Sequence, residues 1–217
     1  MPGRYVVGIT GASGVAYGWR VVRALLDRGH RVDLIITPAG YQVLEEEMGL
    51  VGRSPLEVAA FFAGPRELEA PGNPGAGLHL YDCNDLRADI ASGSVPVDGV
   101  AIVPCSMSTV SALATGRSGD LLERVGDVAL KEGRRLVVVP RETPLSVVHL
   151  RNLLLLAEAG AVILPAMPGF YHRPRRVEEL VEFVAGKVLT ALGVGQTLLP
   201  PWDPERRRWA TGGSPAL

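Results

Sequence analysis

The 217-residue chain has few cysteines, no excess of charge of either sign and no long apolar run. Cys83 and Cys105 are too few for a disulfide framework, and no Cys-His cluster has the spacing of a zinc site. Because 22 basic residues balance 23 acidic ones, nothing favours nucleic acid or an anionic membrane surface as a partner. No run approaches the ~20 apolar residues that span a bilayer, and the N-terminus lacks the layout of a signal peptide. We therefore expect a cytoplasmic protein without a metal site.

Hydrophobic residues make up 47% of the chain, in short runs rich in valine and isoleucine that alternate with helical patterns. Most of these runs are apolar throughout, as in parallel strands that helices cover on both faces. The predicted strands are Tyr5–Thr10, Val32–Thr37, Leu78–Tyr81, Val100–Pro104, Leu136–Pro140 and Ala161–Pro165. The alternation predicts a doubly wound α/β fold of the Rossmann or flavodoxin type, with a mostly parallel six-stranded sheet in a three-layer sandwich.

Helices are predicted between the strands. Apolar residues at helical spacing are Val15, Trp19, Val22 and Leu26 near the N-terminus and Leu180, Val184, Val188 and Leu192 near the end. Ser54 to Glu57 is typical of a helix start, with an N-cap serine and a capping-box glutamate. We expect residues 1–195 to form a single domain. The tail 196–217 breaks the pattern, and its Trp202 and Trp209 would be costly to leave in water, which favours an arm onto a neighbouring subunit.

The first predicted strand ends in the glycine-rich segment 8–14, which passes directly into a helix. Glycines let backbone amides approach an anion, the helix N-terminus adds partial positive charge, and the Ser13 hydroxyl can add a hydrogen bond. This turn favours a phosphate-bearing ligand, although such turns also serve packing. The second strand ends in Thr37 with no acid to hold a ribose, and no tyrosine is followed by lysine four residues later. Nicotinamide dinucleotide chemistry is therefore disfavoured.

Two further strand ends carry polar side chains. Ser106, Ser108 and Thr109 follow the fourth strand, where they can cap a helix or bind a ligand at the same edge. Arg141 and Glu142 follow the fifth strand and offer a planar fork suited to phosphate and a group that can hold or move a proton. A surface ion pair is the simpler interpretation of these two charges. The anion-binding features at the neighbouring strand ends favour a site instead.

Other candidates are more ambiguous. Cys105 can be a small buried residue or a nucleophile. After the sixth strand, PAMPGFYHRP presents Phe170 and Tyr171 at the same edge. Lys187 borders the buried stripe of the last helix and can extend to solvent or reach a bound phosphate. Lys131 ends a helix, where a cation is favourable in any case.

Five segments resemble the signature stretches of the UbiX-type flavin prenyltransferases, in that family's order and over most of the chain. They are GITGASG (8–14), ASGS (91–94), PCSMSTVSA (104–112), LKEGRRLVVVPRETPLSVVHLRN (130–152) and EAGAVILPAMPGFYHRP (158–174). The resemblance implies an enzyme that binds FMN and joins a dimethylallyl group from dimethylallyl monophosphate to N5 and C6 of the reduced flavin, without a metal. Its product, prenylated FMN, would serve a UbiD-type decarboxylase. It also implies that residues 1–195 are a flavin-binding domain of a homododecamer with sites at subunit junctions.

Matching position by position, the resemblance assigns FMN binding to Gly11, Ala12, Ser13, Thr37, Ser106, Met107, Ser108, Thr109 and Arg141. It assigns the substrate phosphate to Lys131, Glu142, Tyr171 and Lys187, the prenyl pocket to Ser92, Gly93 and Ser94, and a covering role to Trp209, with Trp202 as the alternative. Its catalytic residues would be Glu142, Ser13 and Glu47. Thr37 stands where serine is usual and Lys187 where arginine is common. Because lysine lacks the bidentate fork, phosphate affinity is the property most in question.

Two other functions are considered. An FMN-dependent cysteine decarboxylase of the phosphopantothenoylcysteine type shares the architecture, but that family carries an Asn- and Met-rich segment where this chain has PAMPGFYHRP. A non-catalytic flavin-binding or assembly protein has no need of Glu142 beside Arg141. The sequence does not distinguish dimethylallyl monophosphate from the diphosphate as donor.

Overall fold

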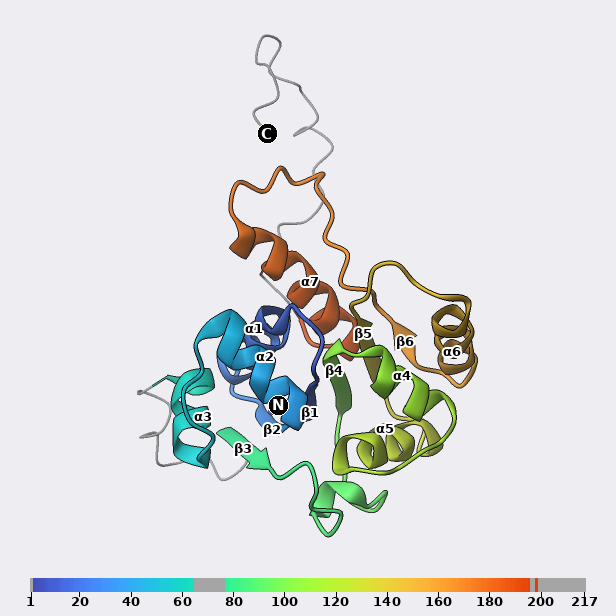
Figure 1. Cartoon of the computed structure of the whole chain (residues 1–217). Coiled ribbons are helices and arrows are strands. Elements are labelled where there is room, and N and C mark those ends of the chain that lie inside the picture. The colour runs from blue at the N-terminus through green and yellow to red at the C-terminus, as the bar shows by residue number, and fades with distance from the viewer. Residues whose placement is uncertain (1, 65–76, 196–197, 199–217) are drawn as a thin grey trace.

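A single parallel sheet forms the centre of the computed structural model, which describes residues 2–64, 77–195 and 198 (Figure 1). Its strands lie in the order β3-β2-β1-β4-β5-β6, and every neighbouring pair is parallel. The strands are β1 (Arg4–Ile9), β2 (Arg31–Ile36), β3 (Gly77–Tyr81), β4 (Gly99–Cys105), β5 (Leu136–Pro140) and β6 (Val162–Ile163). The predicted six-stranded, doubly wound sheet is confirmed.

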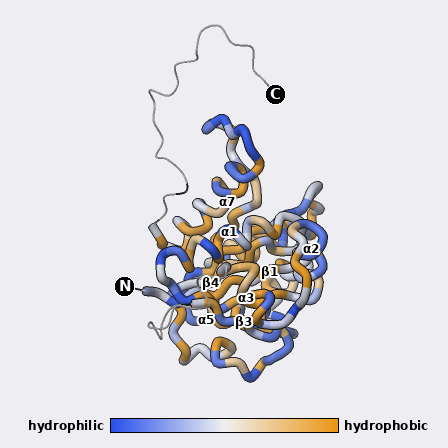
Figure 2. The backbone as a smooth tube through the Cα atoms, turned by 90° about the vertical axis from the view of Figure 1, so that its left-hand side faces the viewer, coloured by the Kyte–Doolittle hydropathy of each residue, from blue (hydrophilic) through white to orange (hydrophobic). Residues whose placement is uncertain are grey.

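Helices cover both faces of this sheet, which confirms the three-layer sandwich. The α-helices are α1 (Val15–Leu26), α2 (Pro38–Met48), α3 (Pro55–Ala63), α4 (Met107–Ala114), α5 (Leu121–Lys131), α6 (Val147–Glu158) and α7 (Val177–Leu192). Apolar side chains of α1, α2, α3 and α7 form one core against the sheet, and those of α4, α5 and α6 form the other. Alternate residues of one strand enter different cores, as Ala101 and Ile102 of β4 do, which explains why the strands are apolar throughout. Figure 2 shows hydrophobic backbone concentrated around β1 and β4, with hydrophilic segments toward the outside.

Local sequence signals account for several helix starts and for one close contact. Ser54 accepts a hydrogen bond from the Glu57 amide while the Glu57 side chain bonds back, so the predicted capping box is present. On α1, Val15 and Val22 of the predicted stripe are buried, whereas Trp19 is only partly buried. The buried face is completed by Gly18, where a Cβ atom would lie 2.2 Å from the carbonyl oxygen of Val103. The glycine therefore lets α1 approach β4.

The sixth strand is shorter than predicted. Only Val162 and Ile163 form it, rather than the whole of Ala161–Pro165. Beyond Ile163 the chain still bonds to β5, because the Leu164 amide donates a hydrogen bond to the carbonyl oxygen of Val138 at 2.9 Å. A second such bond follows after Pro165, from the Ala166 amide to the carbonyl oxygen of Pro140 at 3.1 Å, so isolated bonds to β5 continue beyond the two residues that form the strand.

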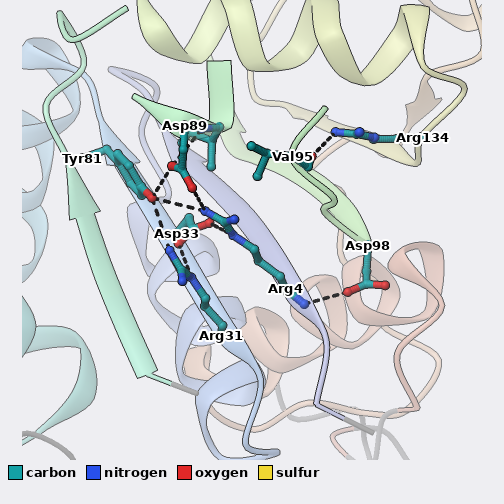
Figure 3. A network of polar contacts seen from close by, with 9 residues as sticks. Arg4, Arg31, Asp33, Tyr81, Asp89, Val95, Asp98 and Arg134 are labelled. Atoms are coloured by element: carbon teal, nitrogen blue, oxygen red, sulfur yellow. Dashed lines mark hydrogen bonds and ion pairs between the residues drawn. The ribbon is translucent and has the colours of Figure 1, made fainter. Parts of the chain in front are cut away.

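Charged side chains meet at the amino edge of the sheet, the edge at which the strands begin (Figure 3). The fully buried carboxylate of Asp33 accepts hydrogen bonds from Nε of Arg4 at 2.5 Å and from Nε of Arg31 at 2.9 Å. Arg4 also pairs with Asp89 at 2.8 Å, and the Tyr81 hydroxyl donates to Asp89 at 2.7 Å. This network joins β1, β2 and β3 to the segment that leads into β4.

That segment, residues 82–98, runs alongside α5 in place of a long crossover helix. At one end the Leu121 amide, at the start of α5, donates to the carbonyl oxygen of Cys83 at 2.8 Å. At the other end Arg134, which lies between α5 and β5, donates to the carbonyl oxygens of Gly93 and Val95. The short helix η1 (Asp89–Ala91) lies between these two points. Residues 92–95 consequently lie at the amino edge.

Within the described ranges 2–64 and 77–195, no helix combines the length and apolarity needed to cross a membrane. The same residues contain no group of three His, Cys, Asp or Glu side chains arranged to hold a metal ion. The predicted arm at 196–217, with Trp202 and Trp209, lies outside the described residues apart from Leu198.

Candidate functional site at the carboxyl edge of the sheet

Hydrogen bonds join the ends of β2, β1 and β4 into one continuous edge, the carboxyl edge. The Thr37 amide donates to the Ile9 carbonyl oxygen at 3.0 Å. The Thr10 hydroxyl donates to the carbonyl oxygen of Pro104 at 2.8 Å and accepts from the Ser106 amide at 2.7 Å. Thr10 was not a sequence candidate, although it lies inside the glycine-rich segment. Its buried hydroxyl fixes the start of α4 against the first turn.

The same edge continues through β5 to β6. The Arg141 amide donates to the carbonyl oxygen of Cys105 at 3.3 Å, and the Ala166 amide donates to that of Pro140 at 3.1 Å. The Arg141 side chain reaches back to the first turn, where its Nε donates to the Ser13 carbonyl oxygen at 3.2 Å. The structure therefore brings the residues that follow β1, β2, β4 and β5 together, as the sequence predicted.

Arg141 is placed to receive an anion. Its Nε is occupied by Ser13, while its two terminal nitrogens have no partner among residues 2–64 and 77–195. The guanidinium is thus held in position with its fork open, a geometry that suits phosphate. Glu142, partly buried, accepts a hydrogen bond at 2.9 Å from the Thr143 amide. The alternative interpretation, a surface ion pair between Arg141 and Glu142, is not formed among the described residues.

A carboxylate from another helix caps the start of α1. Its N-cap, Gly14, has a φ of 96° and gives no side-chain cap. Instead the carboxylate of Glu47, from the last turn of α2, accepts hydrogen bonds from the amides of Gly14 at 2.9 Å and Val15 at 3.2 Å. Two amides that could bind a phosphate are therefore partnered by a carboxylate of the chain itself. The donors of the turn that remain are those of Gly11 to Ser13.

The start of α4 offers a second set of donors. The Ser106 hydroxyl caps the helix by accepting from the Thr109 amide at 3.3 Å. Met107 and Thr109 are buried, and Ser108 is exposed. A helix N-terminus with an exposed serine in its first turn is a suitable place for the polar edge of a ligand. Both interpretations of the serine-rich segment, capping and ligand binding, are compatible with this geometry.

Two residues predicted to bind phosphate, Tyr171 and Lys187, contact the same aromatic ring on α7. Tyr171, 58% exposed, meets Phe183 edge-on with ring centroids 5.7 Å apart. Nζ of Lys187 lies 5.8 Å from the centroid of the same ring. The structure therefore brings Tyr171 and Lys187 together at the end of the loop that follows the carboxyl edge.

The remaining candidates lie at the opposite edge of the sheet. Ser92 and Ser94 share a hydrogen bond of 2.8 Å, and a Cβ atom on Gly93 would come within 3.0 Å of Nζ of Lys131. Lys131 is exposed and paired with Glu132. These residues form one cluster at the amino edge, away from Arg141 and Glu142 of the same chain.

Neither cysteine has the environment of a nucleophile. Burial raises the pKa of the Cys105 thiol well above its usual range, and burial with nearby Asp120 raises that of Cys83 to about 12. A reactive thiol needs a lowered pKa, so Cys105 is a structural residue of the core.

A cavity of about 360 Å³ lies beside the site, at the carboxyl ends of β2 and β3. Its lining residues are Ile36, Pro38, Tyr41, Arg53, Pro55, Leu80, Tyr81, Asp82, Cys83 and Asn84. No sequence motif predicted this cavity, because its walls come from α2, the start of α3 and β3.

The geometry corresponds to a class of flavin-binding α/β proteins. Residues 2–189 match the family described as Flavoprotein, which covers most of the chain. Relatives that align with the chain over most of their length identify the particular family within this class.

The chain is 48% identical over 204 residues to the flavin prenyltransferase UbiX of Halalkalibacterium halodurans, covering 94% of this chain and 95% of that protein. It is 43% identical over 202 residues to the flavin prenyltransferase UbiX of Pseudomonas aeruginosa, covering 93% and 94%. The chain belongs to the flavin prenyltransferase UbiX family.

Solved structures agree with this assignment. A crystal structure of AnUbiX in complex with FMN and dimethylallyl pyrophosphate matches with a TM-score of 0.80 and 35% identity, covering 94% of this chain and 98% of that one. A dodecameric FMN-dependent UbiX-like decarboxylase from Escherichia coli O157:H7 matches with a TM-score of 0.78 and 34% identity, covering 92% and 99%. A phosphopantothenoylcysteine-type (PPC) decarboxylase matches with a TM-score of 0.52 but only 18% identity, which shows the shared fold alone.

Proposed function

We propose that this protein joins a dimethylallyl group from dimethylallyl monophosphate to N5 and C6 of reduced FMN. The observation that carries the proposal is the open guanidinium fork of Arg141, held by Ser13 at the carboxyl edge with Glu142 as the next residue. The UbiX relatives, and a similar structure with FMN and dimethylallyl pyrophosphate, support the same chemistry.

The residues of the carboxyl edge fit FMN. Arg141 and the first turn of α4 offer unpartnered donors for the phosphate and the polar edge of the ring. The proposed FMN-binding residues are Gly11, Ala12, Ser13, Thr37, Ser106, Met107, Ser108, Thr109 and Arg141. Reduced FMN, when bound, supplies the electron-rich atoms that accept the allyl group. The chain positions the flavin through these donors.

The donor phosphate would be held by Lys131, Glu142, Tyr171 and Lys187. Cationic and hydroxyl groups around a departing phosphate lower the barrier because they stabilise the charge that develops as the C–O bond breaks. Glu142 lies beside Arg141 and can accept or return a proton in the same step. Glu47, fixed on the amides of α1, and Ser13 would act at the same edge.

The site is completed by a second copy of the chain. Ser92, Gly93, Ser94 and Lys131 lie at the amino edge, so within one copy they cannot line a pocket at the carboxyl edge. The apolar side chains that α6 leaves exposed, which are Val147, Val148, Leu150, Leu154 and Leu155, offer a surface for such a contact. The dodecameric relative from E. coli supports an assembly of twelve copies. Trp209, proposed to cover the prenyl group, lies outside the described residues.

The deciding experiment is anaerobic. The protein is mixed with FMN, dithionite and dimethylallyl monophosphate, and the mass of the released flavin is measured. A gain of one dimethylallyl unit supports the proposal, and activation of an apo UbiD-type decarboxylase by the same flavin supports the proposed recipient. Unmodified flavin with both the monophosphate and the diphosphate would refute it.

The role of Glu142 has its own test. Replacing it with alanine removes the proton-transfer group but leaves Arg141 and Ser13 in place. We expect prenylation to slow by about 10²-fold or more while the Kd for FMN changes by less than about 3-fold. Unchanged turnover in Glu142→Ala would remove this residue from the mechanism.

A further inference from the structure

The ring of Phe183 on α7 is the point at which the loop after β6 is attached. His172 stacks on it, with centroids 5.4 Å apart and planes 7° from parallel. Tyr171 meets the same ring edge-on, and Nζ of Lys187 lies within 5.8 Å of its centroid. Two of the four residues proposed to hold the donor phosphate, Tyr171 and Lys187, therefore contact the same aromatic ring as His172.

His172 makes no side-chain hydrogen bond within the described residues that explains a histidine at this position. Both ring nitrogens are buried and have no hydrogen-bond partner among the described residues. An unpartnered buried nitrogen is unfavourable, and such groups are rare in native structures. Within the described residues, His172 instead places the flat face of its ring on Phe183, and a stack of this geometry is favourable between aromatic side chains.

The loop that carries His172 is tightly constrained. Arg173 has a φ of 56°, a left-handed backbone that is uncommon for residues other than glycine, and its amide closes a turn onto the Phe170 carbonyl oxygen at 2.9 Å. At Gly169 a Cβ atom would lie 2.9 Å from Tyr171 and 3.1 Å from Phe183. A strained turn persists only where surrounding contacts outweigh the strain. The stack of His172 on Phe183 is such a contact.

We propose that His172 is a positioning residue for the prenyl donor. Its stack on Phe183 fixes the turn at residues 170–173, and the fixed turn holds Tyr171 against the same Phe183 ring that the ammonium group of Lys187 approaches. The inference rests on the proposed function, because it assigns these two residues to the donor phosphate. It predicts that the stacked ring sets donor affinity and leaves the FMN-binding edge unchanged.

The test compares His172→Ala, which removes the ring, with His172→Phe, which keeps a stacking ring but has no nitrogens. His79→Ala is the matched control, since His79 is exposed on β3 at the far edge of the sheet. FMN-loaded protein is titrated with dimethylallyl monophosphate by calorimetry, and KM and kcat are measured where turnover is present. Melting temperature and FMN affinity are recorded for every variant.

We expect His172→Ala to raise the donor Kd and KM by about 10-fold, with kcat and FMN affinity within about 3-fold of the parent. His172→Phe should bind the donor within about 3-fold of the parent and melt no lower, because two unsatisfied nitrogens are removed. Equal weakening in both variants would overturn the proposal, because the nitrogens would then be the active feature. An unchanged donor Kd in His172→Ala would also overturn it.

If His172→Ala does not fold, Phe183→Leu removes the other ring of the stack and must weaken donor binding in the same way. The calorimetric Kd separates this inference from the proposed function. If the parent protein binds the donor but transfers no dimethylallyl group, the proposed function is contradicted. The positioning role of His172 is then still decided by the same comparison of donor Kd values among the variants.

Discussion

Replacing Asp33 with alanine tests whether the network at the amino edge stabilises the sheet. The Asp33 side chain is 0% exposed and is the shared acceptor for Arg4 and Arg31, whose side chains are 18% and 23% exposed. Without it, Arg31 loses its acidic partner and keeps the Tyr81 hydroxyl, and the side-chain partners left to Arg4 among the described residues are the exposed Asp89 and the same hydroxyl. Burial lowers and the two acidic partners raise the pKa of Arg4, with a net rise, so this guanidinium stays charged.

The expected cost follows from this geometry. Breaking a buried ion pair by removing one partner costs about 3–5 kcal/mol, and the partial exposure of both arginines favours the lower end of that range. For a chain of this length ~3 kcal/mol corresponds to a fall in Tm of roughly 6–12 °C. Equilibrium unfolding in urea, followed by circular dichroism, measures the free energy directly.

Asp98→Ala provides the matched control. Asp98 lies at the same edge but is exposed and accepts a hydrogen bond of 2.7 Å from the Arg4 backbone amide. Its loss should cost less than about 1.5 kcal/mol. FMN affinity should be unchanged in both variants, because the network lies at the opposite edge from Arg141. Equal stability of Asp33→Ala and Asp98→Ala would refute the reasoning.

Three further outcomes are expected. Glu47→Ala should lower the free energy of unfolding by about 1–2 kcal/mol relative to Glu46→Ala, because α1 loses the side chain that caps its N-terminus. Equal stability of the two variants in urea unfolding would contradict a stabilising role for this cap. The hydrogen bond from Arg117 lowers the pKa of buried Glu123 below its ordinary value of 4.5, and this effect outweighs burial, which raises it. The ionised Glu123 therefore stabilises the fold above pH 4.5, and this stabilisation is lost as the pH falls through the lower pKa of the folded state. Glu123→Gln should flatten the loss of stability between about pH 5 and 3, and an unchanged slope would contradict this. Cys105 should react with a thiol reagent at pH 8 only after unfolding, and rapid labelling of the folded protein would contradict its assignment to the core.

The sequence predicted those parts of the fold that rest on local pattern. Apolar runs predicted both ends of five of the strands to within one residue, and the capping box at Ser54 was found because both of its members lie within one helical turn. The sixth strand was predicted too long, because an apolar run does not show where the regular pairing of an edge strand gives way to isolated backbone bonds. Gly18 was missed for a similar reason, since its close contact is with Val103, far along the chain.

The candidate site was predictable only in outline. Strand ends in a parallel sheet meet at one edge, so Thr37, Ser106 and Arg141 could be grouped before any geometry was known. The partner of Glu47 could not, because nothing local shows that the last turn of α2 reaches the first turn of α1. Asp33 likewise lies in an apolar strand, and its role depends on the register that sets Arg4 opposite Arg31.

The separation of Lys131 from Glu142 has a genetic consequence. If one copy contributes the carboxyl edge of a site and another contributes the amino edge, the two edges can carry different mutations. A copy with Lys131→Ala still presents an intact Glu142, and a copy with Glu142→Ala still presents an intact Lys131. Two variants that are each inactive would therefore regain some intact sites when their copies mix within one symmetric assembly, so two defective alleles could complement each other in the same cell.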